Sequence, residues 1–260
     1  MAQLMIATKK YDAIVIGAGH AGVETSLCIA RAGFQVLLMT MDLNTVAKMS
    51  CNPAVGGLAK GHMVRELDAL GGEMGKAIDQ TGIQFRMLNR SKGPAVWAPR
   101  AQADKKQYSL YMKGIIQDEK NIDLKQAQAT EILVRHGKCY GVRTKEGEEV
   151  FARNVIVTTG TFLQGLIHVG EVHYPGGRTG EKPAVGLSDS LKKNGIELIR
   201  FKTGTPPRLL DVSIHWSKME EQKGDNPPEP FSYQTDRLNV NQVSCYLTYT
   251  NEKSHEIIET

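Results

Sequence analysis

The 260-residue sequence has only four cysteines and no long hydrophobic run, and both absences argue against whole classes of protein. The cysteines form no Cys-x-x-Cys pair and lack the spacing of a metal site, which argues against a disulfide scaffold, a structural zinc or another metal centre. No apolar stretch approaches the roughly 18 residues that span a bilayer. Residues 1–10 are too short for a signal peptide and lack its layout, so we expect a cytoplasmic protein with no membrane partner.

A strong net charge is also missing. The 32 basic residues nearly balance the 28 acidic residues and leave a formal charge of +4, which permits a nucleic-acid partner without indicating one. An ordinary solvated surface is the simpler interpretation of the charge alone. The hydrophobic content of 41% is enough for a real core, and the length suits one large domain or one domain and part of another.

The chain does contain a strand, a glycine turn, a helix and a second strand, in that order, between residues 11 and 40. Apolar residues 12–16 lead into a G-x-G-x-x-G turn at 17–22, residues 23–32 have helical spacing, and residues 34–39 alternate. In a βαβ phosphate cradle the first glycine makes the turn, the second admits a pyrophosphate, and the third lets helix and strand pack. The helix N-terminus adds free N–H groups for the anion. This pattern predicts a bound dinucleotide.

One missing residue leaves the identity of the dinucleotide open. An acid normally holds the ribose hydroxyls about twenty residues past the glycines, and here that place is taken by Thr40, with Asp42 two residues beyond. The cradle by itself therefore does not say which dinucleotide is bound. An ordinary glycine-rich turn between strand and helix is the alternative interpretation.

Cys51 is the first candidate for chemistry. It lies in a turn created by Asn-Pro and Gly-Gly pairs, and a helix-like start with Lys60 and His62 follows. A thiol beside a helix N-terminus and cationic side chains can serve as a nucleophile. Cysteine is more commonly a small buried hydrophobe, so both interpretations stay open.

The segment 89–104 combines basic residues with an aromatic ring and shows little periodicity. Arg90, Lys92 and Arg100 surround Trp97, a combination that can contact phosphates and stack on a base or ring. An ordered connecting loop with Trp97 packed against the protein explains the same residues. The two interpretations are equally supported by the sequence.

Three strand-like runs at 127–134, 138–144 and 150–157 predict a β-meander, since each pair is separated by a short turn that contains glycine. The last run leads into Thr158-Thr159-Gly160 and resembles the closing strand of the FAD domain in two-dinucleotide-binding flavoproteins. Cradle, meander and Thr-Gly strand together favour FAD. We therefore expect an α/β fold, with a Rossmann-like FAD-binding domain of parallel sheet and β-meander.

The sequence also predicts further helices and strands, a glycine-rich loop and a domain boundary. We expect helices at 61–70, 105–117 and 186–194 and strands at 198–202 and 242–249, with a helix and strand within 73–88. Glycine-rich residues 161–185 predict a loop near a ligand, in which Arg178 could meet a phosphate or carboxylate. A boundary near Lys202 separates the FAD-binding domain, 1–202, from the start of a second, inserted domain, 203–260. Because no later strand returns to the first sheet, we expect the chain to be a fragment.

Several longer stretches make the sequence similar to the MnmG (GidA) family, FAD-dependent enzymes that modify the wobble uridine of tRNA. The resemblance runs from residue 11 to the end. The stretches at 49–62 and 202–209 are far more distinctive than the glycine turn. The stretches are GAGHAGVE at 17–24, MSCNPAVGGLAKGH at 49–62, GPAVWAPRAQAD at 93–104, TTGTFLQGLIHVG at 158–170, GGRTGE at 176–181, KTGTPPRL at 202–209 and CYLTYTNEKSHEII at 245–258.

The resemblance implies a reaction on U34 of tRNA, carried out by a homodimer together with the GTPase MnmE. Methylene-tetrahydrofolate would donate the carbon and glycine or ammonium the amine, which places a carboxymethylaminomethyl or aminomethyl group on uridine C5. FAD would mediate the redox step, and NADH would reduce it.

The resemblance also implies roles for individual residues. Cys51 matches one of two essential cysteines, a nucleophile or general acid–base, whereas the second, which is not Cys245, lies beyond Thr260. Ala129, at the end of the first meander strand, would meet the adenosine half of FAD, and Ala184 would lie in the loop near the flavin. The residues implied to bind the pyrophosphate are Gly17, Ala18, Gly19, His20, Ala21 and Gly22.

One departure and three alternatives accompany the resemblance. Trp97-Ala98-Pro99 stands where many relatives carry a basic residue, which puts a phosphate contact there in doubt. The alternatives are a folate- and FAD-dependent tRNA uridine methyltransferase, a generic NADH-linked flavoprotein reductase, and a module that only docks a GTPase or RNA. A reductase usually needs a redox Cys-x-x-Cys near the flavin, and none is present. The tRNA- and MnmE-binding helices are implied beyond residue 260, so we expect residues 1–260 alone to be inactive and to bind FAD weakly.

Overall fold

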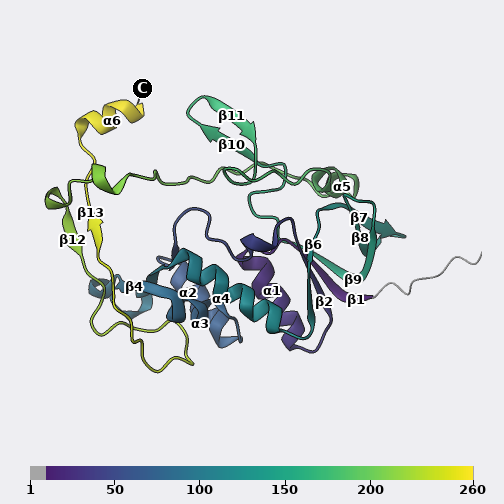
Figure 1. Cartoon of the computed structure of the whole chain (residues 1–260), viewed down its shortest axis with the longest axis horizontal. Helices are drawn as coiled ribbons and strands as arrows, with labels where there is room; N and C mark the ends of the chain where they lie inside the picture. The colour runs from purple at the N-terminus through teal and green to yellow at the C-terminus, as the bar shows by residue number, and fades with distance from the viewer. Residues whose placement is uncertain (1–9, 260) are drawn as a thin grey trace, which may run out of the picture.

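The computed structural model describes residues 10–259, and its largest element is a six-stranded sheet (Figure 1). The strand order is β6-β2-β1-β9-β8-β7, with the first four strands parallel and the last two antiparallel. This confirms the α/β class with a parallel sheet and a meander. Residues 1–9, on which the expectation of no signal peptide depends, lie outside the described range. The strands are β1 (Tyr11–Ile16), β2 (Val36–Thr40), β6 (Ile122–Gln126), β7 (Ala129–Arg135), β8 (Lys138–Thr144) and β9 (Glu149–Val157).

Both faces of the parallel part are covered. β2 is buried along its whole length, as its unbroken apolar run requires in a parallel sheet covered on two sides. On one face, Val15 and Leu38 join a cluster with α1 (His20–Arg31) and α4 (Lys105–Asp118). On the other face, Ile14 and Leu37 pack with the meander and with α5 (Leu187–Lys193). The cradle is therefore attached to a rigid sheet.

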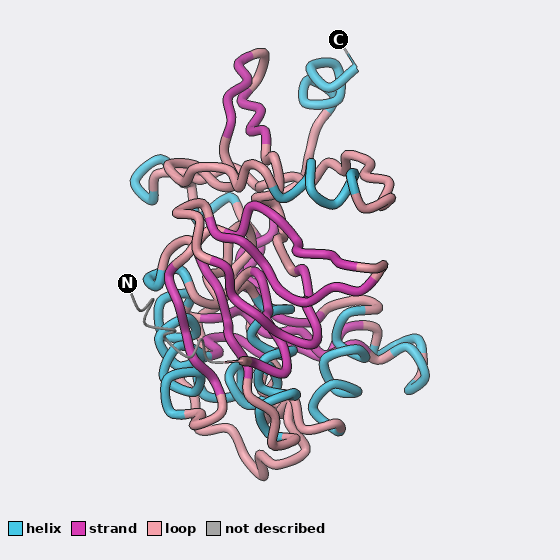
Figure 2. The backbone as a smooth tube through the Cα atoms, turned by 90° about the vertical axis from the view of Figure 1, so that its right-hand side faces the viewer, coloured by secondary structure: helices cyan, strands magenta, loops and turns pink. Residues whose placement is uncertain are grey.

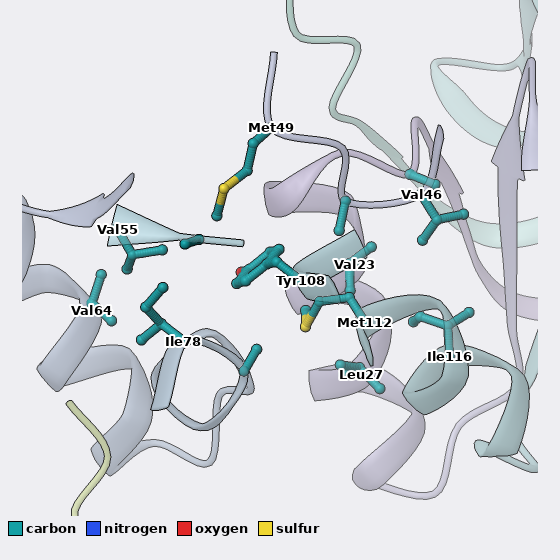
Figure 3. Packing of buried hydrophobic residues seen from close by; sticks show 14 of the residues in the cluster. Val23, Leu27, Val46, Met49, Val55, Val64, Ile78, Tyr108, Met112 and Ile116 are labelled. Carbon is teal, nitrogen blue, oxygen red and sulfur yellow. The ribbon is translucent and has the colours of Figure 1, made fainter. Parts of the chain in front are cut away.

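A second, three-stranded sheet shares the first cluster. Its order is β3 (Ala54–Gly56), β5 (Ala98–Ala103), β4 (Gly82–Leu88), and it packs with α2 (Lys60–Ala69) and α3 (Met74–Thr81). Figure 3 shows Val55, Val64 and Ile78 from this region on one side of Tyr108, with Val23 and Met112 on the other. Tyr108 thus lies where the two parts of the core meet.

One prediction about this sheet was wrong. Residues 89–104 do not form only a loop, because two 3₁₀ turns (Arg90–Lys92 and Pro94–Val96) are followed by β5. Pro99 lies in that strand and cannot donate a ladder hydrogen bond, so the sequence pattern hides it. In α4 the buried residues include Met112 and Ile116, whereas Leu110 is exposed.

The glycine-rich residues 161–185 also contain more structure than predicted. They form a hairpin of β10 (Leu166–Val169) and β11 (Val172–Pro175), which projects from the body of the protein (Figure 2). The strand predicted at 198–202 is absent. Ile199 and Phe201 are 70% and 86% exposed there, since no sheet edge lies beside this alternating apolar run.

The C-terminal part crosses the molecule and packs against the three-stranded sheet (Figure 1). It contains β12 (Glu220–Gln222), β13 (Cys245–Leu247) and α6 (Glu252–Glu259), with short 3₁₀ turns at Asp211–Ser213 and Trp216–Lys218. A further 3₁₀ turn, Leu43–Thr45, follows β2. The Asp79 carboxylate accepts hydrogen bonds from the N–H groups of Phe231 and Ser232 at 2.8 and 2.9 Å. Phe231 itself is buried in the core. The domain boundary near Lys202 stays a prediction.

Candidate functional site

The glycine turn closes against the segment that follows the last meander strand. Gly17 has a φ of +106°, which favours glycine, and its N–H donates to Met39 O at 2.8 Å. The Oγ1 of Thr158 lies 3.0 Å from the carbonyl oxygens of both Ile16 and Gly17. A Cβ on Gly17 would lie 2.5 Å from Thr158 O, so a larger residue does not fit. The fold thus joins the glycine turn and the Thr-Thr-Gly segment.

The N-terminus of α1 is open at this turn. The helix begins at His20, earlier than the predicted residue 23. The prediction began too late because Ala21 and Gly22 carry no apolar periodicity. No side chain caps it, and its first turn contains no acid. A Cβ on Gly19 would meet nothing within 4 Å, whereas one on Gly22 would lie 1.8 Å from Gly17 O. Free N–H groups and the positive end of the helix dipole therefore face open space, which suits an anion.

Arg178 adds a cation near this helix start. Its guanidinium lies 4.9 Å from the ring centroid of Phe162, and its Nε lies 3.4 Å from a carboxylate oxygen of Glu181. Its Nε and Nη1 are buried, yet neither makes a hydrogen bond within residues 10–259. Burial lowers the pKa of Arg178, while the charges of Glu181 and Asp42 oppose that shift. A guanidinium in this state can donate to two oxygens of a phosphate or carboxylate.

His20 shows that Arg178 is close to the glycine turn. Burial lowers the pKa of His20, and the positive charge of Arg178 lowers it further. The imidazole packs edge-on against Tyr108 with ring centroids 5.7 Å apart, and its Nδ1 is buried without a hydrogen-bond partner in the described part of the chain. The ring is therefore neutral near pH 7 and leaves the positive charge of the site to Arg178 and the helix N-terminus.

The position of the ribose-binding acid is filled by a threonine that bonds locally. Thr40 is buried at the end of β2, and its Oγ1 donates to Asp42 O at 3.2 Å. The Asp42 carboxylate accepts from the N–H of Asn44 at 2.8 Å. Asp42 is therefore the acidic residue at the end of β2. Its carboxylate caps the 3₁₀ turn at Leu43–Thr45.

Cys51 lies in the turn that leads into the three-stranded sheet. Its side chain is half-buried and forms no disulfide. β3 separates Cys51 from α2, which corrects the prediction that a helix follows its turn directly. The backbone carbonyl of Cys51 accepts a hydrogen bond from the Arg208 guanidinium. Two distinctive stretches of the sequence, 49–62 and 202–209, therefore meet at the backbone of Cys51.

Ala129 and Ala184 lie on neighbouring segments. Ala129 is buried and begins β7, which corrects its expected place at the end of that strand. Ala184 is also buried, and its N–H donates to Phe162 O at 2.8 Å. The segments meet because Gln128 Nε2 donates to Val185 O at 3.0 Å.

The basic segment at 89–104 does not gather its cations in one place. Arg90 pairs with Glu229 at 2.7 Å and with Asp225 at 3.4 Å. Trp97 packs against Arg90 and donates from its Nε1 to the Arg90 carbonyl at 3.2 Å. These contacts favour the ordered connecting segment over a phosphate-binding loop. Arg100 lies instead on β5.

The sequence reasoning missed Thr158 and Arg208 as site residues. Both belong to stretches singled out above, TTGTFLQGLIHVG and KTGTPPRL, and that membership was the only available signal. Among residues 10–259, no group of three or more His, Cys, Asp or Glu side chains could hold a metal ion. No helix in that range is long and apolar enough to cross a membrane.

Comparison with known proteins gives a consistent result. Residues 12–260 match the family described as "Glucose inhibited division protein A". The chain is 56% identical over 252 residues to a protein of Geotalea uraniireducens and over 254 residues to one of Thermodesulfovibrio yellowstonii, covering 97% and 98% of this chain. Both relatives are named "tRNA uridine 5-carboxymethylaminomethyl modification enzyme MnmG".

Solved structures agree with the sequence comparison. The form I crystal structure of Aquifex aeolicus GidA superposes with a TM-score of 0.93 at 50% identity, over 96% of this chain and 43% of that one. The curated relatives named above are covered over only 40% and 41% of their length. This chain therefore belongs to the glucose inhibited division protein A (GidA) family.

Proposed function

We propose that this chain forms the FAD-binding part, and carries one catalytic thiol, of a tRNA uridine-modifying flavoenzyme. The observation that carries the proposal is the open N-terminus of α1 beside Arg178, whose buried Nε and Nη1 make no hydrogen bond within the described residues. It occurs in a member of a family whose relatives are named as modifying tRNA uridine. A tRNA-modifying flavoprotein explains both the anion site and the family.

The residues around the cradle fit FAD. The N–H groups at the start of α1 would hold the pyrophosphate, with Gly19 leaving room for its approach. Arg178 would donate to a phosphate oxygen, and neutral His20 would place no second charge there. Ala129 and Ala184 would contact the adenosine half and the flavin side of the cofactor. When bound, FAD supplies two-electron redox chemistry.

Cys51 would act on the uridine, as nucleophile or as general acid–base. Its half-buried side chain is accessible enough for a substrate, and its turn is tied to the 202–209 stretch by Arg208. Arg208 is therefore a positioning residue in this proposal. A second thiol would come from outside these 260 residues.

The finer parts of the reaction extend from the relatives to this chain. We propose that the enzyme works as a cytoplasmic homodimer with the GTPase MnmE on U34 of tRNA. Methylene-tetrahydrofolate would supply the methylene carbon, and NADH would reduce the flavin. The product would carry an aminomethyl or carboxymethylaminomethyl group on C5.

The test replaces Cys51 by serine in the full-length protein and analyses bulk tRNA nucleosides by mass spectrometry. C51S is expected to abolish the C5 modification in a strain that lacks the natural gene, because the hydroxyl is a far weaker nucleophile than the thiol. The C139S variant is the matched control and should restore modification, since Cys139 lies in β8.

FAD absorbance of the purified C51S protein separates chemistry from folding, and it is expected to equal that of the wild type. Normal modification by C51S would contradict the catalytic role. Loss of 5-methyluridine in the gene-deleted strain, with C5 aminomethyl groups intact, would support the methyltransferase alternative.

A further inference from the structure

Two arginines lie directly opposite each other on the three-stranded sheet. Arg86 of β4 pairs in register with Arg100 of β5. Side chains at directly opposed positions lie on the same face with Cβ atoms about 4.5–5.5 Å apart, and like charges there destabilise the sheet. The opposed arginines therefore lower the stability of the sheet, so a contribution to folding does not explain why they are paired.

Neither arginine forms an ion pair with an acidic residue in the described part of the chain. Within residues 10–259, the ion pairs of arginine involve Arg31, Arg90, Arg143 and Arg178, and neither Arg86 nor Arg100 is among them. The Nε of Arg86 is buried and has no hydrogen-bond partner in that range. Arg90, by contrast, is held by two carboxylates. Arg86 and Arg100 are therefore two opposed cations that have no carboxylate partner among the described residues.

The pair faces a small hollow on the side of the sheet away from the core. Phe85 and Ala101, the neighbours in register, point into the hydrophobic core, so Arg86 and Arg100 point away from it. The hollow has a volume of about 30 Å³ and is lined by Gln84, Arg86, Leu88, Arg100, Gln102 and Gln222. It has room for the oxygens of one anionic group but not for a base or a sugar.

The hollow is connected to Cys51 through the same sheet. Gly56, the last residue of β3, pairs with Arg100, and Cys51 precedes Gly56 by five residues. Five residues span at most about 18 Å, which limits the Cα distance from Cys51 to Gly56, the residue opposite Arg100. The hollow is therefore within reach of the backbone of an RNA whose target base lies at Cys51.

We propose that Arg86 and Arg100 together bind a backbone phosphate of the substrate RNA and position the target uridine at Cys51; this inference rests on the proposed function. Two guanidiniums that share one small hollow suit the oxygens of a phosphodiester. Phosphate contacts of this kind fix the register of a nucleic acid without reading its sequence. Both arginines are therefore positioning residues.

The test measures binding of unmodified tRNA to the full-length protein between about 50 and 200 mM salt, a range over which affinities that depend on phosphate contacts fall steeply. R86Q and R100Q are each expected to weaken binding about tenfold and to lower the slope of log affinity against log salt by up to about 0.7–0.9, the value for one phosphate, because both arginines bind the same phosphate. R153Q is the matched control, because Arg153 is exposed on β9, and it should leave the slope unchanged.

Folding is checked by thermal unfolding of the same variants. Removing one of two opposed like charges should keep or raise the Tm, so weaker RNA binding cannot be assigned to misfolding. The R100K variant keeps the charge but loses the planar fork, and we expect it to restore the salt slope more than the affinity.

Each other outcome overturns the inference. If R86Q and R100Q bind tRNA with the wild-type affinity and slope, the inference fails while the proposed function stands. If their loss of affinity is seen for NADH or inorganic phosphate but not for tRNA, the hollow is a small-molecule phosphate site. If the wild-type protein binds no tRNA, both the inference and the proposed function fail.

Discussion

At the scale of single residues, the candidate anion site is defined by buried polar atoms that make no hydrogen bond among the described residues. Arg178 Nε and Nη1 and His20 Nδ1 are buried and lack hydrogen bonds within residues 10–259. Such atoms are rare in folded proteins, because each costs about 1–3 kcal/mol. Their grouping beside one helix N-terminus is the reason for assigning a ligand there.

The neutral state of His20 predicts a pH dependence. Its folded pKa is lowered, so between that pKa and the ordinary value near 6.5 the unfolded chain binds more protons than the folded one. The free energy of unfolding should therefore fall as pH drops below about 6.5. Urea unfolding between pH 5 and 8 is expected to show this loss in the wild type and less of it in H20Q.

Arg178 provides the matched variant for this measurement. Its charge is the second cause of the lowered pKa of His20, so R178Q should reduce the loss at low pH without removing it. An H20Q protein that keeps the full wild-type decline would show that another group is responsible.

At the scale of elements, the cradle depends on two glycines for different reasons. Gly22 is required for packing, since its Cβ would collide with the Gly17 carbonyl. Gly19 has an extended backbone that alanine can adopt, and its Cβ would point into open space. One glycine is thus needed by the fold and the other by the ligand.

Alanine at these two positions should separate folding from cofactor binding. G22A is expected to lower the free energy of unfolding by about 2 kcal/mol or more, because the clash is with backbone. G19A should change it by less than about 1 kcal/mol, yet weaken FAD binding at least tenfold by blocking the approach of the pyrophosphate. Urea unfolding and a flavin fluorescence titration measure the two quantities. Normal FAD affinity in G19A would place the cofactor elsewhere.

At the scale of the whole molecule, the C-terminal segment is bound to the three-stranded sheet by carboxylates and amides. Asp79 accepts from Phe231 and Ser232, and Asp225 accepts from the N–H of Met87 at 2.6 Å. Gln242 accepts from the N–H of Phe85 at 2.8 Å. These contacts link residues more than 130 positions apart and place β12 beside the arginine hollow.

Removing the Asp79 carboxylate should release this segment. D79A is expected to lower the free energy of unfolding by about 2–4 kcal/mol, because two buried N–H groups lose a charged acceptor. Hydrogen exchange at residues 225–243 should accelerate, while exchange in β1 and β2 should not. D236A is the control, since Asp236 is exposed in the same segment. Unchanged exchange at 225–243 in D79A would show that the other contacts suffice.

Short-range patterns predicted much of this protein. The cradle, the meander, α2, α3, α4 and α5 follow from apolar periodicity, glycine turns and β-branched runs, and each was expected within a few residues of its observed bounds. β5 was missed because Pro99 disguises it, and the strand at 198–202 was expected because its alternation looks the same with or without a neighbouring strand. Such errors arise where tertiary pairing decides the outcome.

The sequence by itself determined the βαβ cradle, the meander and the likeness to the GidA family, because these depend on residues close together in the chain. Only the tertiary structure decided that Thr158 closes the glycine turn, that Arg178 reaches His20, and that Arg86 faces Arg100. Each of these pairs joins residues separated by 14 to 158 positions, and no local pattern encodes such a meeting. Strand register and the packing of the two sheets bring them together.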